Sequence, residues 1–515
     1  MRKLAEDMNI GYFDRPDNKG AKAGNLNNAL AKTSAPYIIT LDADMIPMSS
    51  FLLKTIPYFV DAKKRSDDIK LGLLQTPQSF YQPDVFQHAL HSEKNAPNEQ
   101  DFFYRTIEVS KTSTNSVIYG GSNTILAREA LDSIGGFYTE TITEDFATGL
   151  LIETKGYVSL ALGEPMASGM APDTYKEHIQ QRKRWGRGVI NTAKQLHFMK
   201  DRGLSVPQKF SYLSSVLYWL SPVKNLIYIC SPLMFATFAI PVFKCSWVDL
   251  ILYWLPMFIM QDVTLRVFSK NAVSLKWSGI YETTIMPHML VPIIKEVFGI
   301  SASKFEVTDK TGRHKRIRAD RNIVLPFYIL IALSVIGVIR SLYIFGITKA
   351  LGIFVLLFWL VRNLYFLIMA VFAVSGRDSE IEPVKVIDAE MVTFSKKNTE
   401  NEDIVMYGVT TYMTEHNLKA FLDEAEQLNV GDTVRICLET GNYKANVTGI
   451  VTGILIPRSG GISCVATAEI TDMESSEYEY LQILYDRIPS LPQSLHRDLG
   501  VIRHLLINIA HRILD

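Results

Sequence analysis

Four nearly uncharged segments in the second half of this 515-residue chain constrain its fold more than any other feature. They cover residues 225–243, 247–263, 323–345 and 350–374. A helix needs about 20 apolar residues to cross the ~30 Å hydrocarbon core of a bilayer. The three longer segments reach that length, and residues 247–263 reach it with tilt or local thinning of the bilayer. The sequence therefore predicts a helical membrane region.

Basic residues flank these segments asymmetrically. Residues 182–187 precede the first segment, and residues 304–321 carry seven Lys or Arg between the second and the third. By the positive-inside rule these parts are cytoplasmic, and four crossings return the C-terminus to the same side. Residues 212–221 are rich in aromatic residues, and residues 280–298 combine aromatic residues with Lys295 and Glu296, with Pro287 and Pro292 interrupting this second stretch. We expect both to lie in the membrane plane, with ordinary helices of the bundle as the alternative.

Residues 1–205 have the pattern of an α/β domain. Residues 37–41 predict a buried strand, residues 71–76 and 117–119 predict two more, and residues 25–31 have helical spacing. Strands that alternate with helices favour a mostly parallel sheet.

The C-terminal region predicts a small β-barrel followed by a helix. Residues 434–438, 444–451 and 463–470 read as strands, residues 417–428 as a helix and residues 499–514 as the C-terminal helix. We therefore divide the chain into an α/β domain at 1–205, a membrane region at 206–376 and a β-barrel region at 377–515.

Composition excludes several classes of function. Lys plus Arg and Asp plus Glu both number 53, so net charge gives no reason to expect a nucleic-acid partner. The four cysteines form no CxxC pair, which argues against a zinc site or a disulfide framework.

Two aspartates follow the first expected strand. Asp42 and Asp44 lie at its carboxyl end, where ligands of open α/β sheets bind. Their hard oxygens suit magnesium or manganese that bridges a diphosphate. We expect a divalent-cation and nucleotide-sugar site there; solvated turn aspartates are the alternative, and on composition alone the commoner one.

A second acidic motif begins an apolar helix. Thr143 could cap that helix while Glu144 and Asp145 complement its dipole. Alternatively, Asp145 is a general base that removes the proton of an attacking sugar hydroxyl, with Glu144 beside the acceptor. Both interpretations fit the tripeptide taken alone.

Basic and aromatic residues complete the candidate site. Arg184 can bind phosphate oxygens with paired donors, Trp185 offers a flat face to a sugar ring, and Gln181 belongs to the same pocket. The alternative is a juxtamembrane patch that binds anionic lipid, in particular through Arg182 and Lys183. Lys22 is a candidate phosphate or uracil contact, with a solvated loop lysine as the alternative.

Three polar residues fall inside the apolar segments. Arg340, Arg362 and Asn363 would be costly in hydrocarbon and by default face a polar cavity. We interpret them as lining a channel, or as pairing groups within the helix bundle.

Taken together, these motifs resemble the catalytic subunits of bacterial cellulose synthases, processive members of glycosyltransferase family 2. The matching motifs are Lys22-Ala23-Gly24-Asn25, Gln75-Thr76-Pro77, Asn98-Glu99-Gln100-Asp101, Gly121-Ser122-Asn123, Thr143-Glu144-Asp145 and Gln181 to Trp185. The resemblance implies a GT-A-type domain that uses UDP-glucose, a helical transmembrane bundle and a PilZ-like β-barrel. PilZ domains are receptors for cyclic-di-GMP.

The resemblance also implies roles for single residues. Asp42 and Asp44 would contact UDP and its metal, Asp145 would be the base, and Gln181, Arg184 and Trp185 would hold diphosphate and acceptor. A gating loop at 303–312 would move over the donor site. Its matching residues are Phe305, Val307, Thr308 and Lys310.

The chain departs from the family pattern in three ways. It begins after the opening strands of the transferase domain, which would leave an exposed sheet edge and half a nucleotide pocket. Met45 stands where many cellulose synthases have histidine. Ile381 and Val405 replace an arginine and a serine of the PilZ signatures, so we do not expect the usual cyclic-di-GMP binding.

The resemblance thus implies a bacterial inner-membrane, inverting, processive glycosyltransferase that extends β-1,4-glucan from UDP-glucose and threads it through its own channel. Another β-linked polysaccharide is one alternative. A subunit that needs a partner chain to complete its nucleotide site is another. A plain transporter would leave the acidic motifs unexplained. Expected partners are the bilayer, the growing glucan and a periplasmic or extracellular export subunit.

Overall fold

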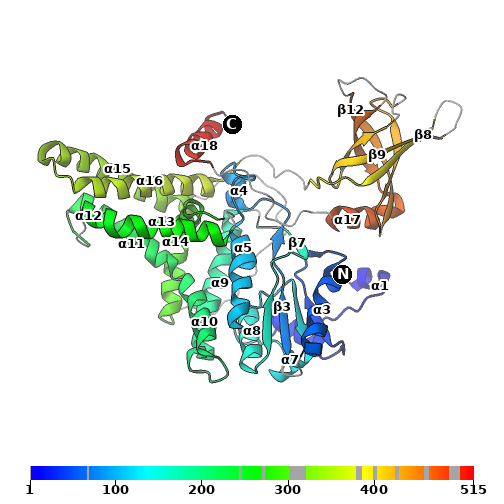
Figure 1. The fold of residues 1–515 in the computed structure, drawn as a ribbon, viewed down its shortest axis with the longest axis horizontal. Coiled ribbons are helices and arrows are strands. Elements are labelled where there is room, and N and C mark those ends of the chain that lie inside the picture. Colours follow the sequence, from blue (N-terminus) through cyan, green and yellow to red (C-terminus); the bar gives the residue numbers. More distant parts are fainter. Residues whose placement is uncertain are drawn as a thin grey trace.

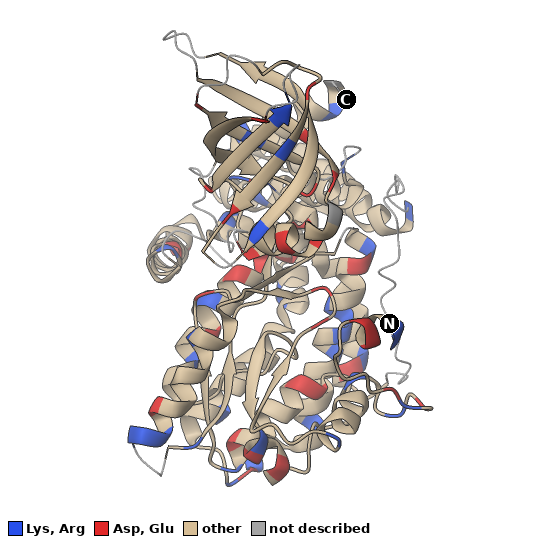
Figure 2. Ribbon diagram, turned by 90° about the vertical axis from the view of Figure 1, so that its right-hand side faces the viewer, with Lys and Arg blue, Asp and Glu red and all other residues tan. Residues whose placement is uncertain are grey.

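The computed structural model describes residues 2–65, 69–172, 174–242, 246–269, 273–300, 321–377, 385–397, 403–423, 428–441, 443–456, 463–486 and 499–514. Figure 1 shows three parts: an α/β domain, a group of long helices that extends to the left, and a β-barrel at the upper right. Residues of both charge signs are interspersed along the ribbon of the α/β domain (Figure 2).

The α/β domain is built on a mixed sheet of four strands in the order β1-β5-β3-β6. These strands are β1 (Tyr37–Thr40), β3 (Leu71–Gln75), β5 (Thr124–Ala127) and β6 (Val158–Ala161). β1, β3 and β6 run in the same direction, and β5, which lies between β1 and β3, runs antiparallel to both. Three of the four strands thus fit the expected mostly parallel sheet, and β5 is the exception.

A second, three-stranded sheet lies beside the first in the order β2-β7-β4. It consists of β2 (Ile46–Pro47), β4 (Ser79–Phe80) and β7 (Ala167–Gly169). The helices of the domain are α1 (Arg2–Asp7), α2 (Ala21–Leu30), α3 (Phe51–Arg65), α4 (Val85–Ala89), α5 (Glu99–Phe102), α6 (Val109–Lys111), α7 (Arg128–Ser133), α8 (Glu144–Thr154) and α9 (Tyr175–Leu196).

The strand expected at residues 117–119 is absent from this described part of the chain. The segment is buried, but side chains rather than a neighbouring strand satisfy its backbone N–H groups. Val117 N donates to Ser159 Oγ at 3.1 Å, and Ile118 N donates to Glu108 Oε2 at 2.7 Å. Burial without a ladder partner gives an extended loop, so the strand prediction is wrong here.

A second core forms among the helices that follow the α/β domain, together with parts of α4 and α9. These helices are α10 (Val206–Tyr218), α11 (Ser221–Phe238), α12 (Trp247–Asp249), α13 (Leu255–Phe268), α14 (Leu275–Val297), α15 (Arg321–Thr348) and α16 (Ile353–Ser375). A short π-helix, Leu250–Trp254, joins α12 to α13. Among the described residues, buried residues of α11, α14, α15 and α16 belong to this core, whereas α12 and α13 supply none of its buried residues. Pro287 and Pro292 lie inside α14 without interrupting it, contrary to expectation.

Three helices of the described residues are long and apolar enough to cross a membrane: Trp247–Phe268, Arg321–Thr348 and Ile353–Ser375. Helix α11, which corresponds to the first expected span, is not one of them; Lys224 and Asn225 lie in its first turns. Among the described residues, the four expected crossings therefore correspond to these three helices and to α11, which does not meet the same criterion of length and hydropathy.

The C-terminal strands form a closed six-stranded barrel in the order β10-β13-β12-β11-β8-β9, as the expected β-barrel requires. The strands are β8 (Met391–Lys397), β9 (Asp403–Met413), β10 (Asn417–Leu422), β11 (Thr433–Glu439), β12 (Lys444–Leu455) and β13 (Cys464–Asp472). The helix expected to begin at residue 417 is wrong. Leu418, Ala420 and Leu422 alternate into the barrel core, while β9 and β13 pair with β10 on either side.

Two helices follow the barrel and contact other parts of the chain. Asp486, at the end of α17 (Glu477–Asp486), accepts a hydrogen bond from Ser49 N of the α/β domain at 2.7 Å. Helix α18 (Val501–Leu514) confirms the expected C-terminal helix and packs near α4, where His504 Nε2 lies 3.0 Å from Ser92 Oγ.

Candidate active site

The two aspartates of the first motif lie in a turn just after β1. Met45 N donates to Asp42 O at 3.0 Å, which closes the turn, and Asp42 N donates to Ser122 Oγ at 2.8 Å. Met45 is buried beneath the turn, with its Sδ 3.8 Å from Asn123 Nδ2. The loop that follows residue 120 therefore fixes the backbone that carries Asp42 and Asp44.

Lys22 connects this turn to the neighbouring loop. Its Nζ donates to Asp42 Oδ1 at 2.5 Å and to Gly121 O at 2.8 Å. Both side chains are only about two-fifths exposed, so the ion pair is partly shielded from water. A cation in this place can bind phosphate oxygens as well as carboxylate.

Asp145 lies in the first turn of α8, directly over the loop that Lys22 contacts. Thr143 is the N-cap residue, but its side chain makes no capping hydrogen bond; its Oγ1 lies 3.1 Å from Thr192 Oγ1 of α9. Gly121 has φ +76°, and a Cβ built on it would lie 2.8 Å from Asp145 Oδ2. The acidic motif and the glycine loop are therefore in close contact, which the capping interpretation does not require.

Burial raises the pKa of both carboxyl groups of this motif. For Asp145 the positive charges of Lys22 and Arg184 oppose the effect of burial. For Glu144, burial followed by the negative charge of Asp145 raises the pKa to about 7. Raised carboxyl pKa values beside cationic groups are typical of acid–base sites.

Helix α9 brings the third motif to the same place. Its N-cap Thr174 accepts from Glu177 N at 3.2 Å, and Gly188 lets the helix approach Thr143 more closely than a side chain would allow. Gln181 Oε1 is buried and has no hydrogen-bond partner among the described residues. A buried amide oxygen without a donor indicates a missing water or ligand.

Arg182 does not form a lipid-binding patch. It is buried, its Nη2 lies 2.8 Å from Glu99 Oε2, and its guanidinium stacks on Trp185 at 4.9 Å from the ring centroid. The lipid-anchor alternative is therefore wrong for this residue. Trp185 is oriented by a cation–π contact within its own helix.

Sequence reasoning assigned no role to two residues that organise the site. Gln75 Oε1 accepts from Gly120 N at 2.8 Å, and Gln75 Nε2 donates to Ser122 O at 3.0 Å. Glu99 holds Arg182 and accepts from Tyr218 Oη at 3.2 Å. Both residues belong to motifs that match the cellulose synthase pattern, and this match could have identified them from the sequence.

Asn363 acts between helices rather than toward a channel. Pro232 lacks an N–H, so within α11 the carbonyl of Tyr228 has lost its usual donor four residues later. Asn363 Nδ2 supplies that donor from α16 at 2.9 Å and is buried. The bundle-pairing interpretation therefore fits this residue.

The two arginines of the apolar helices α15 and α16 also bind within the bundle. Arg340 donates to Thr237 O at the end of α11 and so caps that helix. Arg362 lies over the rings of Trp359 and Phe366, at 5.4 and 4.7 Å from their centroids.

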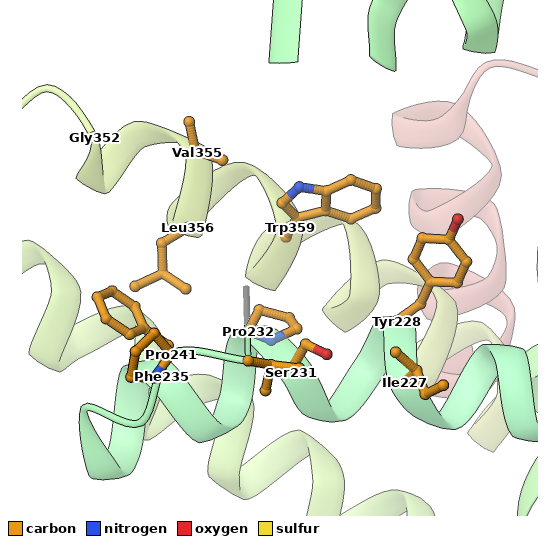
Figure 3. A pocket seen from close by; sticks show the side chains of 11 residues that line it. Ile227, Tyr228, Ser231, Pro232, Phe235, Pro241, Gly352, Val355, Leu356 and Trp359 are labelled. Atoms are coloured by element: carbon orange, nitrogen blue, oxygen red, sulfur yellow. The ribbon is translucent and has the colours of Figure 1, made fainter. Parts of the chain in front are cut away.

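A mainly apolar cavity of about 560 Å³ lies between α11 and α16 (Figure 3). Its described lining does not include Arg340, Arg362 or Asn363. The lining residues are Ile227, Tyr228, Ser231, Pro232, Phe235, Pro241, Val242, Gly352, Val355, Leu356 and Trp359.

The carboxylates of Asp42 and Asp44 fit a cation that is bound jointly by the protein and by a ligand. The described residues contain no group of three or more His, Cys, Asp or Glu that could hold a metal ion. Magnesium is commonly held by one or two carboxylates together with substrate phosphates, which Asp42 and Asp44 can provide for. The gating-loop residues Phe305, Val307, Thr308 and Lys310 lie outside the described residues.

Comparison with known proteins agrees with this site. Residues 37–262, which include the three motifs after Lys22, match the family "Glycosyl transferase family group 2". The chain is 34% identical over 341 residues to "Cellulose synthase 1 catalytic subunit [UDP-forming]" of Komagataeibacter xylinus, which covers 66% of this chain and 45% of that protein. This chain is a homologue of cellulose synthase catalytic subunits.

A second relative, "Cellulose synthase catalytic subunit [UDP-forming]" of Pseudomonas fluorescens, is 29% identical over 449 residues, 85% of this chain and 58% of that protein. The cellulose synthase homologue thus spans about half the length of the relatives it matches. The family match begins at β1 and extends past the α/β domain into α13.

Solved structures are similar at a lower level. The mannosyltransferase PcManGT from Pyrobaculum calidifontis, in complex with GDP-Man and Mn2+, has 15% identity and a TM-score of 0.41 over 58% of this chain and 74% of that one. The PilZ domain with c-di-GMP of YcgR from Escherichia coli has 11% identity and a TM-score of 0.17 over 21% of this chain and 92% of that one.

Proposed function

We propose that this chain is the catalytic part of a processive, inverting glycosyltransferase that polymerises UDP-glucose into β-1,4-glucan. The observation that carries the proposal is the convergence of Lys22, Asp42 and Asp145 on one loop. Lys22 binds both Asp42 and the carbonyl of Gly121, and Gly121 packs against the Asp145 carboxylate. The relatives named as UDP-forming cellulose synthases support the choice of donor and product.

In the proposed reaction Asp145 takes the proton from the acceptor hydroxyl, whose oxygen attacks the anomeric carbon as the bond to UDP breaks. Direct displacement inverts that carbon. Arg184 and Lys22 stabilise the negative charge that develops on the departing diphosphate. Asp42 and Asp44 would hold a divalent cation, magnesium or manganese, which supplies further positive charge there. Gln181, Trp185 and Glu144 orient the acceptor.

We place the enzyme in a bacterial inner membrane, with the transferase domain and the barrel in the cytoplasm. Three apolar helices support membrane insertion, and the basic residues at 304–321 support a cytoplasmic position for that segment. The hydrogen bond from Ser49 N to Asp486 Oδ1 supports the same side for the transferase domain and the barrel. Placing both on one side requires an even number of crossings, with α11 as the fourth. Membrane helices would also guide the growing glucan toward an export subunit. We assign no cyclic-di-GMP site to the barrel, because Val405 presents an apolar side chain on the exposed face of β9.

The test is release of UDP from UDP-glucose in inverted membrane vesicles that contain only this chain. Sustained release with a glucanase-sensitive product is expected. Asp145→Asn should lower the rate about 10²–10⁴-fold while the protein stays folded in the membrane, since a general base contributes that much. Undiminished synthesis by this variant would refute the mechanism.

A subunit that needs a second polypeptide to complete its nucleotide site is the second candidate. The position of β1 at the edge of the described sheet favours it, because an edge strand has unpaired backbone groups that another strand can bind. Tight binding of UDP by the purified chain alone would exclude this candidate.

A further inference from the structure

Helix α10 packs where the two helices with the candidate catalytic residues meet. One buried apolar cluster contains Phe146 of α8, Val189 of α9 and Tyr212 of α10. Tyr212 is completely buried at this junction, whereas Val206 and Phe210 of the same helix are exposed. The inner side of α10 is therefore specialised for contact with α8 and α9.

Tyr212 contacts both ends of α8. Its Oη donates to Oε2 of Glu153, near the end of the helix, at 2.8 Å. Its ring meets the ring of Phe146 edge-on, with centroids 5.6 Å apart and planes at 88°. Phe146 directly follows Asp145, and Phe146 N donates to Asp145 Oδ1 at 2.8 Å. One side chain thus holds the first and the last turn of the helix that carries the base.

Further buried polar groups hold the side chains of Tyr212 and Glu153 in place. Ser159 Oγ donates to Glu153 Oε1 at 2.6 Å, so both oxygens of Glu153 have a donor. Lys111 Nζ lies 5.7 Å from the centre of the Tyr212 ring and donates to Ser215 Oγ, also on α10, at 2.7 Å. Burial raises the pKa of Glu153 well above its usual range.

We infer that Tyr212 is a positioning residue that, through its hydroxyl bond to Glu153 and its ring contact with Phe146, fixes the Asp145 carboxylate relative to Arg184 and Trp185 on α9. This inference rests on the proposed function, in which Asp145 is the base. A displacement of about 1 Å at a reacting group can cost about 10²-fold in rate. The geometry therefore connects a residue of α10, outside every catalytic motif, to the proton-transfer step.

The experiment compares variants that break the bond with variants that keep it. Tyr212→Phe and Glu153→Leu each remove the hydroxyl–carboxyl bond, whereas Glu153→Gln retains a neutral acceptor. Tyr157→Phe is the matched control, because its Oη donates at 3.2 Å to the carbonyl of Glu129 and not to α8. Each variant in vesicles is assayed for kcat and for KM of UDP-glucose, and hydrogen–deuterium exchange is measured across Glu144–Thr154.

Tyr212→Phe and Glu153→Leu should lower kcat about tenfold, leave KM within about twofold and speed amide exchange in α8. Glu153→Gln and Tyr157→Phe should keep the wild-type kcat and KM, and neither should speed amide exchange in α8. A wild-type kcat in the bond-breaking variants, unchanged exchange in α8, or a KM that rises as much as kcat falls would each overturn the inference. Inactivity of the wild type would count against the proposed function instead; exchange in α8 would then decide alone whether Tyr212 holds that helix.

Discussion

Replacing Gly121 by alanine tests whether the loop at this residue fixes the position of the proposed base, Asp145. The glycine has φ +76°, in the left-handed region, and an added Cβ would lie 2.8 Å from Asp145 Oδ2, closer than real Cβ atoms approach. The surrounding loop cannot easily yield, since Lys22 binds the Gly121 carbonyl and Ser122 binds Asp42. We therefore expect the Asp145 carboxylate to move.

Two magnitudes combine in this variant. A left-handed conformation costs an L-residue about 1–2 kcal/mol, which lowers the free energy of unfolding. A displacement of the base by about 1 Å costs about 10²-fold in rate, equivalent to ~3 kcal/mol in the activation barrier. Gly135→Ala is the matched control, because Gly135 has φ +83° but no atom within 4 Å of the added Cβ.

The assay is UDP release in vesicles together with thermal unfolding of each variant. Both variants should lose similar stability, but only Gly121→Ala should lose about 10²-fold in kcat. Activity of Gly121→Ala within a few-fold of the wild type would refute the reasoning. So would an equal loss of activity in Gly135→Ala, because strain alone would then explain both results.

Two further predictions concern buried polar groups. Asn363→Ala should lower the stability of the helix bundle by about 1 kcal/mol, because the Tyr228 carbonyl loses its donor. Adding Pro232→Ala to this variant should restore the stability, because residue 232 then supplies an N–H to the same carbonyl. Thermal unfolding of the two single variants and the double variant measures this rescue, and simply additive effects would contradict it. Glu153 has a raised pKa in the folded state, so the unfolded chain releases its proton first and stability falls as pH rises above the unfolded value. Glu153→Gln removes this cost and should exceed the wild type in stability at pH 9 but not at pH 5; equal melting temperatures at pH 9 would contradict the argument.

Much of the candidate site could be predicted from the sequence because its motifs end or begin regular elements. Asp42 and Asp44 follow an apolar strand, and Asp145 precedes an apolar helix, so local pattern alone places each at an element's end. The barrel strands with clear alternation and the long apolar helices were predictable for the same reason. The spacing of apolar residues along a segment shows which of its faces is buried, and so distinguishes a helix from a strand.

Segments that satisfy their backbone in unusual ways could not be predicted. Val117 and Ile118 are as apolar as a strand, but Ser159 and Glu108, distant in sequence, accept from their N–H groups. The sequence from residue 417 has apolar residues that fit both helix and strand periods. Two neighbouring strands that pair with it decide for β10.

The sequence by itself determined which chemical groups this protein has and at which element ends they lie. The tertiary structure alone decided which of them meet: Lys22 with Asp42, Gly121 with Asp145, and Arg182 with Glu99 rather than with lipid. It also decided that Tyr212 holds the helix of the base. The physical reason is that local periodicity fixes the direction of a side chain, whereas its partner depends on packing between segments far apart in the chain.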